Sequence, residues 1–215
     1  MNSSDTIIDL KDRRVGRADR DRDGLLAYWR EIGGGSDVPR RDDIDPARIA
    51  PCLSRIIVLE RIAPRQARIR LAGQEVGQGF GIESRGMPLS SLITPASREW
   101  LGESIEALFD DPARIDLGLS GPRTTFRKRL TGSMLLLPLR DREDAITRAL
   151  GYIELPERRT TAPIRFEISG EKRESILTRA TRAPMDEPEL PDFEAVDRAR
   201  DAARRRAAFH VVTAD

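Results

Sequence analysis

Cysteine and histidine, the residue types that most often supply nucleophiles and metal ligands, occur once each in this chain of 215 residues. Cys52 has no partner for an intramolecular disulfide, which fits a reducing compartment. His210 lies close to the end of the sequence. A zinc site made of cysteine and histidine is therefore excluded, and a nucleophile–histidine pair would have to use this one histidine. The sequence predicts no metal site.

Carboxylates are the remaining candidates for acid–base chemistry. Asp43, Asp45 and Glu60 stand in segments that also carry arginines. Paired carboxylates transfer protons when their surroundings separate their pKa values, whereas carboxylates beside arginines form ordinary ion pairs. We therefore predict that the chain is not an enzyme and has no catalytic residue, and a carboxylate-dependent enzyme is the alternative. Arg41 and Asp43 are predicted to form a local ion pair in a solvated loop, with binding of a ligand as the alternative.

The two glycine clusters do not fit phosphate-binding loops. Gly33-Gly34-Gly35 has no Lys-Ser/Thr after it, and the glycines between Gly73 and Gly81 lack the G-x-G-x-x-G spacing. The first cluster is predicted to end a helix. The second is predicted to let backbones turn or pack closely.

Charge and hydropathy exclude two further classes of protein. The 37 basic and 36 acidic residues give a net charge of +1, which provides no general attraction to nucleic acid or to an anionic membrane. The first residues lack the basic and apolar regions of a secretion signal. The longest apolar block, Met134 to Leu139, is far shorter than the ~20 residues that cross a bilayer. We predict a cytoplasmic protein that binds neither nucleic acid nor membrane.

The elements that must position these residues follow from hydrophobic periodicity. A flexible leader is expected over residues 1–24, followed by a short helix from Leu25 to Ile32. A second helix is expected from Pro95, capped by Thr94, to Phe109. Strand patterns fall on Arg55–Ile62, Ala67–Leu71, Arg114–Leu119, Thr124–Leu130, Ser133–Arg140 and Thr147–Leu155. Pro138 predicts an edge or a bulge in its strand.

The character of the chain changes at Pro156. Residues 157–191 are predicted as a linker with one weak strand, Arg165 to Ser169. A helix is predicted over 192–210, with acids early and arginines late, as the helix dipole favours. The chain beyond the domain is thus expected to be a partly disordered C-terminal extension.

This order of strands and helices indicates an α+β class and resembles the PAS fold, with a five-stranded antiparallel sheet and flanking helices. The closer resemblance is to a family of bacterial proteins with a single PAS domain, and it spans residues 25–156. It rests on these segments: Leu26-Ala27-Tyr28-Trp29, Val38 to Pro46, Val58-Leu59-Glu60-Arg61, Ala67 to Gly73, Arg85 to Leu89, Leu135 to Leu139, and Arg148-Ala149-Leu150-Gly151.

The resemblance implies a sensory or regulatory module in signalling that acts through a small-molecule ligand, a signalling partner, or both. An adaptor with a solid core, whose predicted C-terminal helix binds another protein, is the alternative. A photosensing flavin domain would carry Asn-Cys-Arg-Phe-Leu-Gln, which is absent, and haem-binding PAS domains usually use a histidine that this core lacks. The resemblance therefore argues against haem and photosensing flavin, and Cys52 is predicted to be a buried structural thiol.

Candidate sites follow from the same fold. An enclosed pocket would have apolar walls, and the candidates are Ile57, Leu71, Phe80, Leu92, Trp100, Leu117, Leu137 and Ile153. These side chains can instead fill one another and leave a solid core. Tyr28 and Trp29 need a surface to cover them, either the sheet or a partner. Since the corresponding helix of PAS domains often mediates dimers, a homodimer is expected. Arg41 and Asp43 complete the candidate interaction residues.

Overall fold

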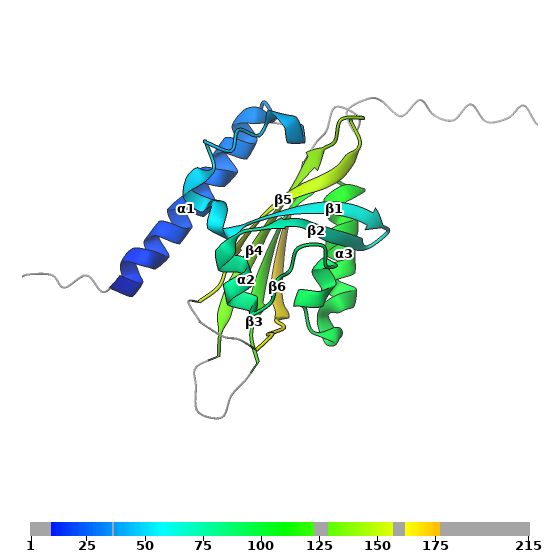
Figure 1. Cartoon of the computed structure of the whole chain (residues 1–215). Coiled ribbons are helices and arrows are strands. Elements are labelled where there is room, and N and C mark those ends of the chain that lie inside the picture. Colours follow the sequence, from blue (N-terminus) through cyan, green and yellow to red (C-terminus); the bar gives the residue numbers. More distant parts are fainter. Residues whose placement is uncertain (1–9, 36, 123–128, 157–161, 177–215) are drawn as a thin grey trace, which may run out of the picture. The chain divides into compact units, whose positions relative to one another are not determined.

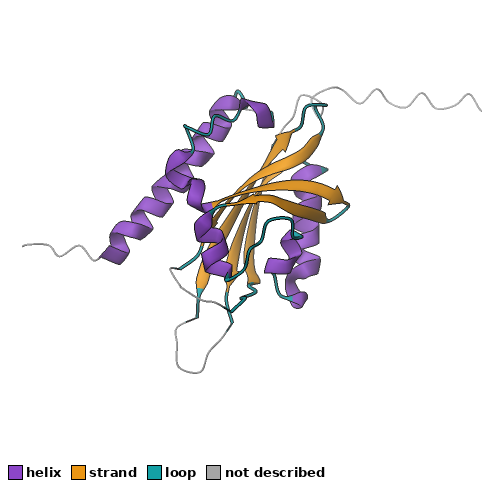
Figure 2. Cartoon of the chain, viewed as in Figure 1, coloured by secondary structure: helices purple, strands orange, loops and turns teal. Residues whose placement is uncertain are grey.

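The computed structural model describes residues 10–35, 37–122, 129–156 and 162–176. One compact unit spans residues 1–179, and a second, 180–215, lies outside the described residues. A single antiparallel sheet forms the centre of the first unit, with strand order β2-β1-β5-β4-β3-β6 (Figures 1 and 2). Its strands are β1 Ile56–Ala63, β2 Gln66–Ala72, β3 Ala113–Ser120, β4 Thr131–Arg140, β5 Ile146–Glu154 and β6 Glu167–Ser175.

In the part of the chain that the structure describes, three α-helices and four short 3₁₀ helices accompany the sheet. The α-helices are α1 Leu10–Ile32, α2 Gln74–Phe80 and α3 Arg98–Phe109. The 3₁₀ helices are η1 Arg41–Asp43, η2 Ala50–Arg55, η3 Leu89–Leu92 and η4 Pro95–Ser97. The α+β class and the PAS-like arrangement are thereby confirmed.

Side-chain alternation along the strands separates two hydrophobic clusters, one on each face of the sheet. The inner cluster joins the sheet to α2, η3 and α3, and includes Ile57, Phe80 and Ile105. The outer cluster joins the opposite face to α1 and η2, and includes Trp29 and Tyr152. In β4, Met134 and Leu136 face the inner cluster whereas Leu135, Leu137 and Leu139 face the outer one. Because a hydrophobic cluster covers each face of β4, this strand is a continuous apolar run.

Helix α1 is fixed to the outer face by polar contacts as well as by packing. The Trp29 indole donates to the Pro138 carbonyl over 3.1 Å, and the Tyr152 hydroxyl donates to the Ala18 carbonyl over 3.1 Å. Arg22 pairs with Asp116 on β3, and Arg30 pairs with Glu174 on β6 at 2.9 Å. The helix therefore has contacts with β3, β4, β5 and β6.

The structure corrects several predicted boundaries. Helix α1 begins at Leu10, so residues 10–24 are helical where a flexible leader was expected; the contacts of Ala18 and Arg22 with the sheet are long-range and invisible in local sequence. Helix α2 was not predicted because two glycines interrupt its pattern. The described sheet has six strands rather than five, because the stretch from Glu167 to Ser175, predicted as mostly linker, pairs with β3. The predicted helix 192–210 and most of the predicted strand Thr124–Leu130 lie outside the described residues.

Pro138 occupies a place in β4 that tolerates the loss of an N–H group. The last pair that joins β4 to β3 is Leu136↔Ile115, so at Pro138 only β5 remains as a neighbour. The strand is internal elsewhere, and the predicted edge is local to this residue.

Candidate functional site: a charged groove on the outer face of the sheet

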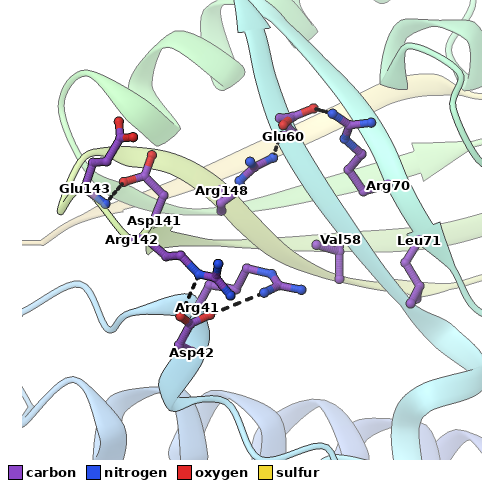
Figure 3. A pocket seen from close by; sticks show the side chains of 10 residues that line it. All are labelled: Arg41, Asp42, Val58, Glu60, Arg70, Leu71, Asp141, Arg142, Glu143 and Arg148. Carbon is purple, nitrogen blue, oxygen red and sulfur yellow. Dashed lines mark hydrogen bonds and ion pairs between the residues drawn. The ribbon is translucent and has the colours of Figure 1, made fainter.

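An open groove of about 650 Å³ lies on the outer face of the sheet, over β1, β2 and β5 (Figure 3). Its floor includes Val58 and Leu71, and its other lining residues are charged: Arg41, Asp42, Glu60, Arg70, Asp141, Arg142, Glu143 and Arg148. These residues come from η1, β1, β2, β5 and the turn between β4 and β5. Segments that are distant in sequence thus contribute to one site.

A bulge in β2 explains how this strand supplies two adjacent residues to the groove. Leu71 pairs with Val58 and Ile69 pairs with Leu59, so Arg70 is an extra residue in β2. Ile69 is fully buried in the inner cluster, whereas Leu71 is 48% exposed. A bulge re-aims side chains in this way. It places both Arg70 and Leu71 at the groove.

Glu60 on β1 is shared between two arginines. Its carboxylate pairs with Arg148, which lies directly opposite it on β5, and with Arg70 from the bulge. The Glu60 side chain is only 15% exposed. Burial alone would raise the pKa of Glu60, but the hydrogen bonds and charges of Arg148 and Arg70 hold that pKa below its ordinary value. Glu60 is therefore a fixed anion at neutral pH.

A second carboxylate, Asp42 on η1, is also shared between two arginines. It lies 3.4 Å from Arg41 Nη1 and 3.2 Å from Arg142 Nε. Both arginine side chains are more than half exposed. Figure 3 shows this trio and the Glu60 trio as separate groups, with Arg148 and Arg70 directed at Glu60 and with Arg41 and Arg142 gathered at Asp42; both trios line the groove.

The turn between β4 and β5 is organised by Asp141. Its carboxylate accepts hydrogen bonds from the Thr147 hydroxyl and from the backbone N–H groups of Glu143 and Ala145, at 2.9 and 3.0 Å for the latter two. The hydrogen bond from Thr147 is the largest cause of a lowered pKa of Asp141, opposed by slight desolvation. Asp141 thus holds the turn that positions Arg142 and Glu143.

The structure divides the eight residues predicted as pocket walls. Ile57, Phe80, Leu92, Leu117 and Ile153 lie together in the inner cluster and are at most 2% exposed. Leu137 lies in the outer cluster, on the other side of the sheet. It cannot share a cavity with the five, because a strand alternates its side chains between faces.

Leu71 and Trp100 are exposed rather than enclosed. The β2 bulge turns Leu71 outward. Trp100 is 37% exposed, and its indole donates to Glu171 at 2.5 Å. Since the buried face of α3 is centred on Leu101 and Ile105, Trp100 stands about 100° away from Leu101 around the helix axis.

The four predicted interaction residues also separate. Tyr28 and Trp29 are 6% and 5% exposed and pack in the outer cluster, so the protein's own sheet covers them and the argument for a dimer through these aromatics is lost. Arg41 lines the groove, but it pairs with Asp42 rather than with Asp43. The Asp43 carboxylate instead accepts the backbone N–H of Arg40 at 3.3 Å.

Cys52 is buried on the outer face, in η2, where its thiol donates to the Ile49 carbonyl over 3.2 Å. Burial raises the pKa of the Cys52 thiol to about 11. The thiol is thus held protonated beneath α1. Among the residues that the structure describes, no group of three or more His, Cys, Asp or Glu side chains is arranged to hold a metal ion.

Sequence reasoning missed most of the groove. Glu60 was considered only as an acid–base residue, and Arg70, Arg142 and Arg148 were not singled out. The pairing of Glu60 with Arg148 depends on the register of β1 and β5, and these two residues are 88 positions apart in sequence. One local signal was available, because arginines flank the apolar positions of β2 and would have to lie on its solvent side.

Comparison with known proteins gives a family match. A PAS domain family model matches residues 19–154, which is more than half of the chain. No curated protein matches. Structures that resemble the chain include the light state of the LOV domain of the blue-light photoreceptor Aureochrome1, at 12% identity, with a TM-score of 0.36 and coverage of 54% of this chain and 90% of that one.

The structure of an RNA-binding Light-Oxygen-Voltage receptor also resembles the chain, at 13% identity, with a TM-score of 0.36 and coverage of 80% of this chain and 42% of that one. Among the described residues, no helix is long and apolar enough to cross a membrane. The family match runs without interruption from within α1 to the last residue of β5. The chain belongs to the PAS domain family.

Proposed function

We propose that this chain is a PAS-type regulatory module that acts by binding, and that the groove on its outer face is the recognition site. The observation that carries the proposal is that the carboxylates in the groove are paired with arginines. Glu60 is held ionised by two arginines, and Asp42 is shared between two more. Guanidinium groups recognise anionic groups through paired, directional hydrogen bonds.

The same observation favours binding over catalysis. A general acid must hold a proton near neutral pH, and a lowered pKa removes this property from Glu60. Asp43 and Asp45, the other carboxylates considered for an enzyme, are absent from the lining of the groove. The three carboxylates therefore do not converge on one reacting centre.

The volume of the groove also fits recognition. Small-molecule sites are clefts of about 300–1,000 Å³ with mostly apolar walls and a few placed polar groups. At about 650 Å³ the groove falls in this range of volume. Its lining is mostly charged, with Val58 and Leu71 as its two apolar residues, which suits a charged ligand.

The test is capture from the protein's own cells. The full chain is purified as wild type, as the double variant Arg70→Met/Arg148→Met, and as Arg98→Met. Arg98 is an exposed residue of α3, which packs on the inner face. We expect an associated molecule or protein that the groove variant loses and Arg98→Met retains. Equal recovery on all three proteins would refute the groove as the recognition site.

Small-molecule sensing inside the inner cluster is a second candidate function. Two buried hydroxyl oxygens, Ser84 Oγ and Thr94 Oγ1, have no hydrogen-bond partner among the described residues. They stand in the segments that join α2, η3 and η4, four residues after Phe80 and two residues after Leu92, both members of the inner cluster. Buried polar groups without a partner are costly and indicate a missing one. Native mass spectrometry of protein from its own cells tests this candidate function. An added mass that is still present on the Arg70→Met/Arg148→Met variant would assign the ligand to the interior.

A further inference from the structure

The geometry points to a specific class of occupant for the groove: a small organic dianion with an apolar body, whose two anionic groups replace or join Glu60 and Asp42 at their arginine pairs. This inference rests on the proposed function and goes beyond it, because it names what the groove binds. It requires two anion subsites, an apolar surface between or beside them, and room for the ligand.

The first subsite is the Arg70–Arg148 pair. Both guanidinium groups point at the Glu60 carboxylate, each through a terminal nitrogen. Each guanidinium has five N–H donors, so each keeps donors beyond those that Glu60 uses. Glu60 is the carboxylate that both arginines pair with, and Arg148 also acts on the nearby Asp141 carboxylate, whose pKa its charge helps to lower. An incoming carboxylate or phosphate finds donors already arranged around an anion of its own kind.

The second subsite is the Arg41–Arg142 pair around Asp42. Its contacts are longer, 3.4 and 3.2 Å, and its side chains are more exposed than Glu60 and Arg148. The β4–β5 turn carries Arg142, and Asp141 fixes this turn. The two subsites are thus unequal, with a tighter one on the sheet and a more open one on η1 and the turn.

The apolar surface decides between a simple anion and one with a hydrocarbon body. Val58 and Leu71 line the same groove as the four arginines (Figure 3). Leu71 is 48% exposed, and the β2 bulge is what exposes it. An aliphatic chain that spans the two subsites would cover this surface, and each methylene it buries would tighten binding up to about fourfold.

The test is calorimetric titration of the full chain at low ionic strength with succinate, adipate and azelate, which have the same ends and increasing length. Nonanoate, with one carboxylate, is the control for the second subsite, and inorganic phosphate is the control for a simple anion. We expect affinity to rise with length among the dicarboxylates, and azelate to bind more tightly than nonanoate or phosphate. The capped peptide Ac-Glu-Leu-Glu-NH₂ presents the same chemistry from a protein; tighter binding of the peptide would assign the dianion to a protein partner.

Matched variants locate the binding. Glu60→Gln frees two guanidinium groups, and we expect it to tighten azelate binding roughly tenfold. Glu143→Gln removes the same charge from the groove, but the Glu143 carboxylate has no ion pair with any described residue. The effect of this variant on the affinity for azelate should therefore be several-fold smaller. Arg70→Met should weaken binding roughly tenfold. Arg70 is half exposed, so this variant is expected to fold even if Arg148→Met does not.

Leu71→Ser tests the apolar surface, since it should flatten the dependence on chain length. Three results would overturn the inference: no binding of any dicarboxylate, affinity that does not depend on length, or equal effects of Glu60→Gln and Glu143→Gln. If any of these results occurs while capture from cells still depends on Arg70 and Arg148, the inference of a dianionic ligand is wrong, but the groove remains the proposed recognition site. If capture is also independent of these arginines, the inference and the proposed function are both wrong.

Discussion

Glu60 shows how a single side chain on a strand acquires its chemistry from neighbours in space. Arg148 is opposite it in the β1–β5 register, and Arg70 reaches it only because β2 contains an extra residue. Neither relation is visible as a sequence motif. The apolar alternation of β2 could be predicted from the sequence, but the bulge that reverses Leu71 could not, since bulges depend on pairing with the adjacent strand.

Acid should remove the stabilisation that Glu60 provides. Its pKa is lower in the folded protein than the ordinary 4.5, so the ionised group stabilises the fold above that value, and this is lost as pH falls through the lowered pKa. At pH 7 we expect Glu60→Gln to lower the free energy of unfolding by about 1 kcal/mol. Urea unfolding at several pH values should show this difference shrink below about pH 4.5. A difference that stays constant down to pH 2 would contradict the ion-pair origin.

Gly73 should not tolerate a side chain. A Cβ at this position would lie 2.3 Å from the Leu53 carbonyl oxygen and 2.4 Å from the backbone of Ser54. Backbone atoms cannot rotate away as a side chain can, so we expect Gly73→Ala to destabilise the protein by about 2 kcal/mol or more. Gly24→Ala, with no atom within 4 Å of the new Cβ, is the control, and should stabilise α1 by up to about 1 kcal/mol. Equal thermal midpoints for the two variants would refute this.

At the scale of elements, α1 differs most from what the sequence predicted. The face formed by Leu25 and Trp29 was recognised, and so was its end near the glycine triplet. Its start was missed because the turns before Leu25 are charged, and their docking uses Arg22–Asp116 and Tyr152–Ala18 contacts that no local pattern carries. A different signal was present: the apolar run Met134–Leu139 is typical of a strand covered on both faces, which requires an element on the outer side.

Trp29→Ala should loosen α1 and expose Cys52. The indole is 5% exposed and donates to Pro138, so its loss is expected to cost about 3–5 kcal/mol. The Cys52 thiol is unreactive while buried and protonated. The rate of its reaction with a disulfide reagent at pH 8 should therefore rise well above that of wild type. Leu53→Ala, at an exposed neighbouring position, should leave the rate nearly unchanged; a similar rise there would point to movement of η2 instead.

At the scale of the whole molecule, two hydrophobic clusters share one sheet. The inner cluster is the larger, and its five predicted members show that the sequence located this part of the core. The α+β class could be read from hydrophobic periodicity. The sixth strand could not, because Lys172 and its charged neighbours resemble a solvated linker. Such charges are what an edge strand needs to avoid pairing with another chain.

The two clusters should differ in how readily they open. Separation of α1 disrupts only the outer cluster, whereas separation of β4 from β5 disrupts both. Native-state hydrogen exchange should therefore show the slowest amides in β4 and β5, and faster exchange in α1. If α1 amides were protected as strongly as those of β5, then α1 would open only when the whole domain unfolds.

The positions of the two tryptophans give the protein an optical label on each face of its sheet. Trp29 is sealed between α1, which carries it, and the sheet at 5% exposure, and Trp100 stands partly in solvent on α3 at 37%. Acrylamide should quench the emission of Trp100 and spare that of Trp29, and Trp100→Phe leaves a spectrum that reports α1 alone. A ligand that lifts α1 would shift that spectrum to the red, while an event confined to the α3 side would leave it unchanged. The natural sequence thus distinguishes the two faces by fluorescence without an added dye.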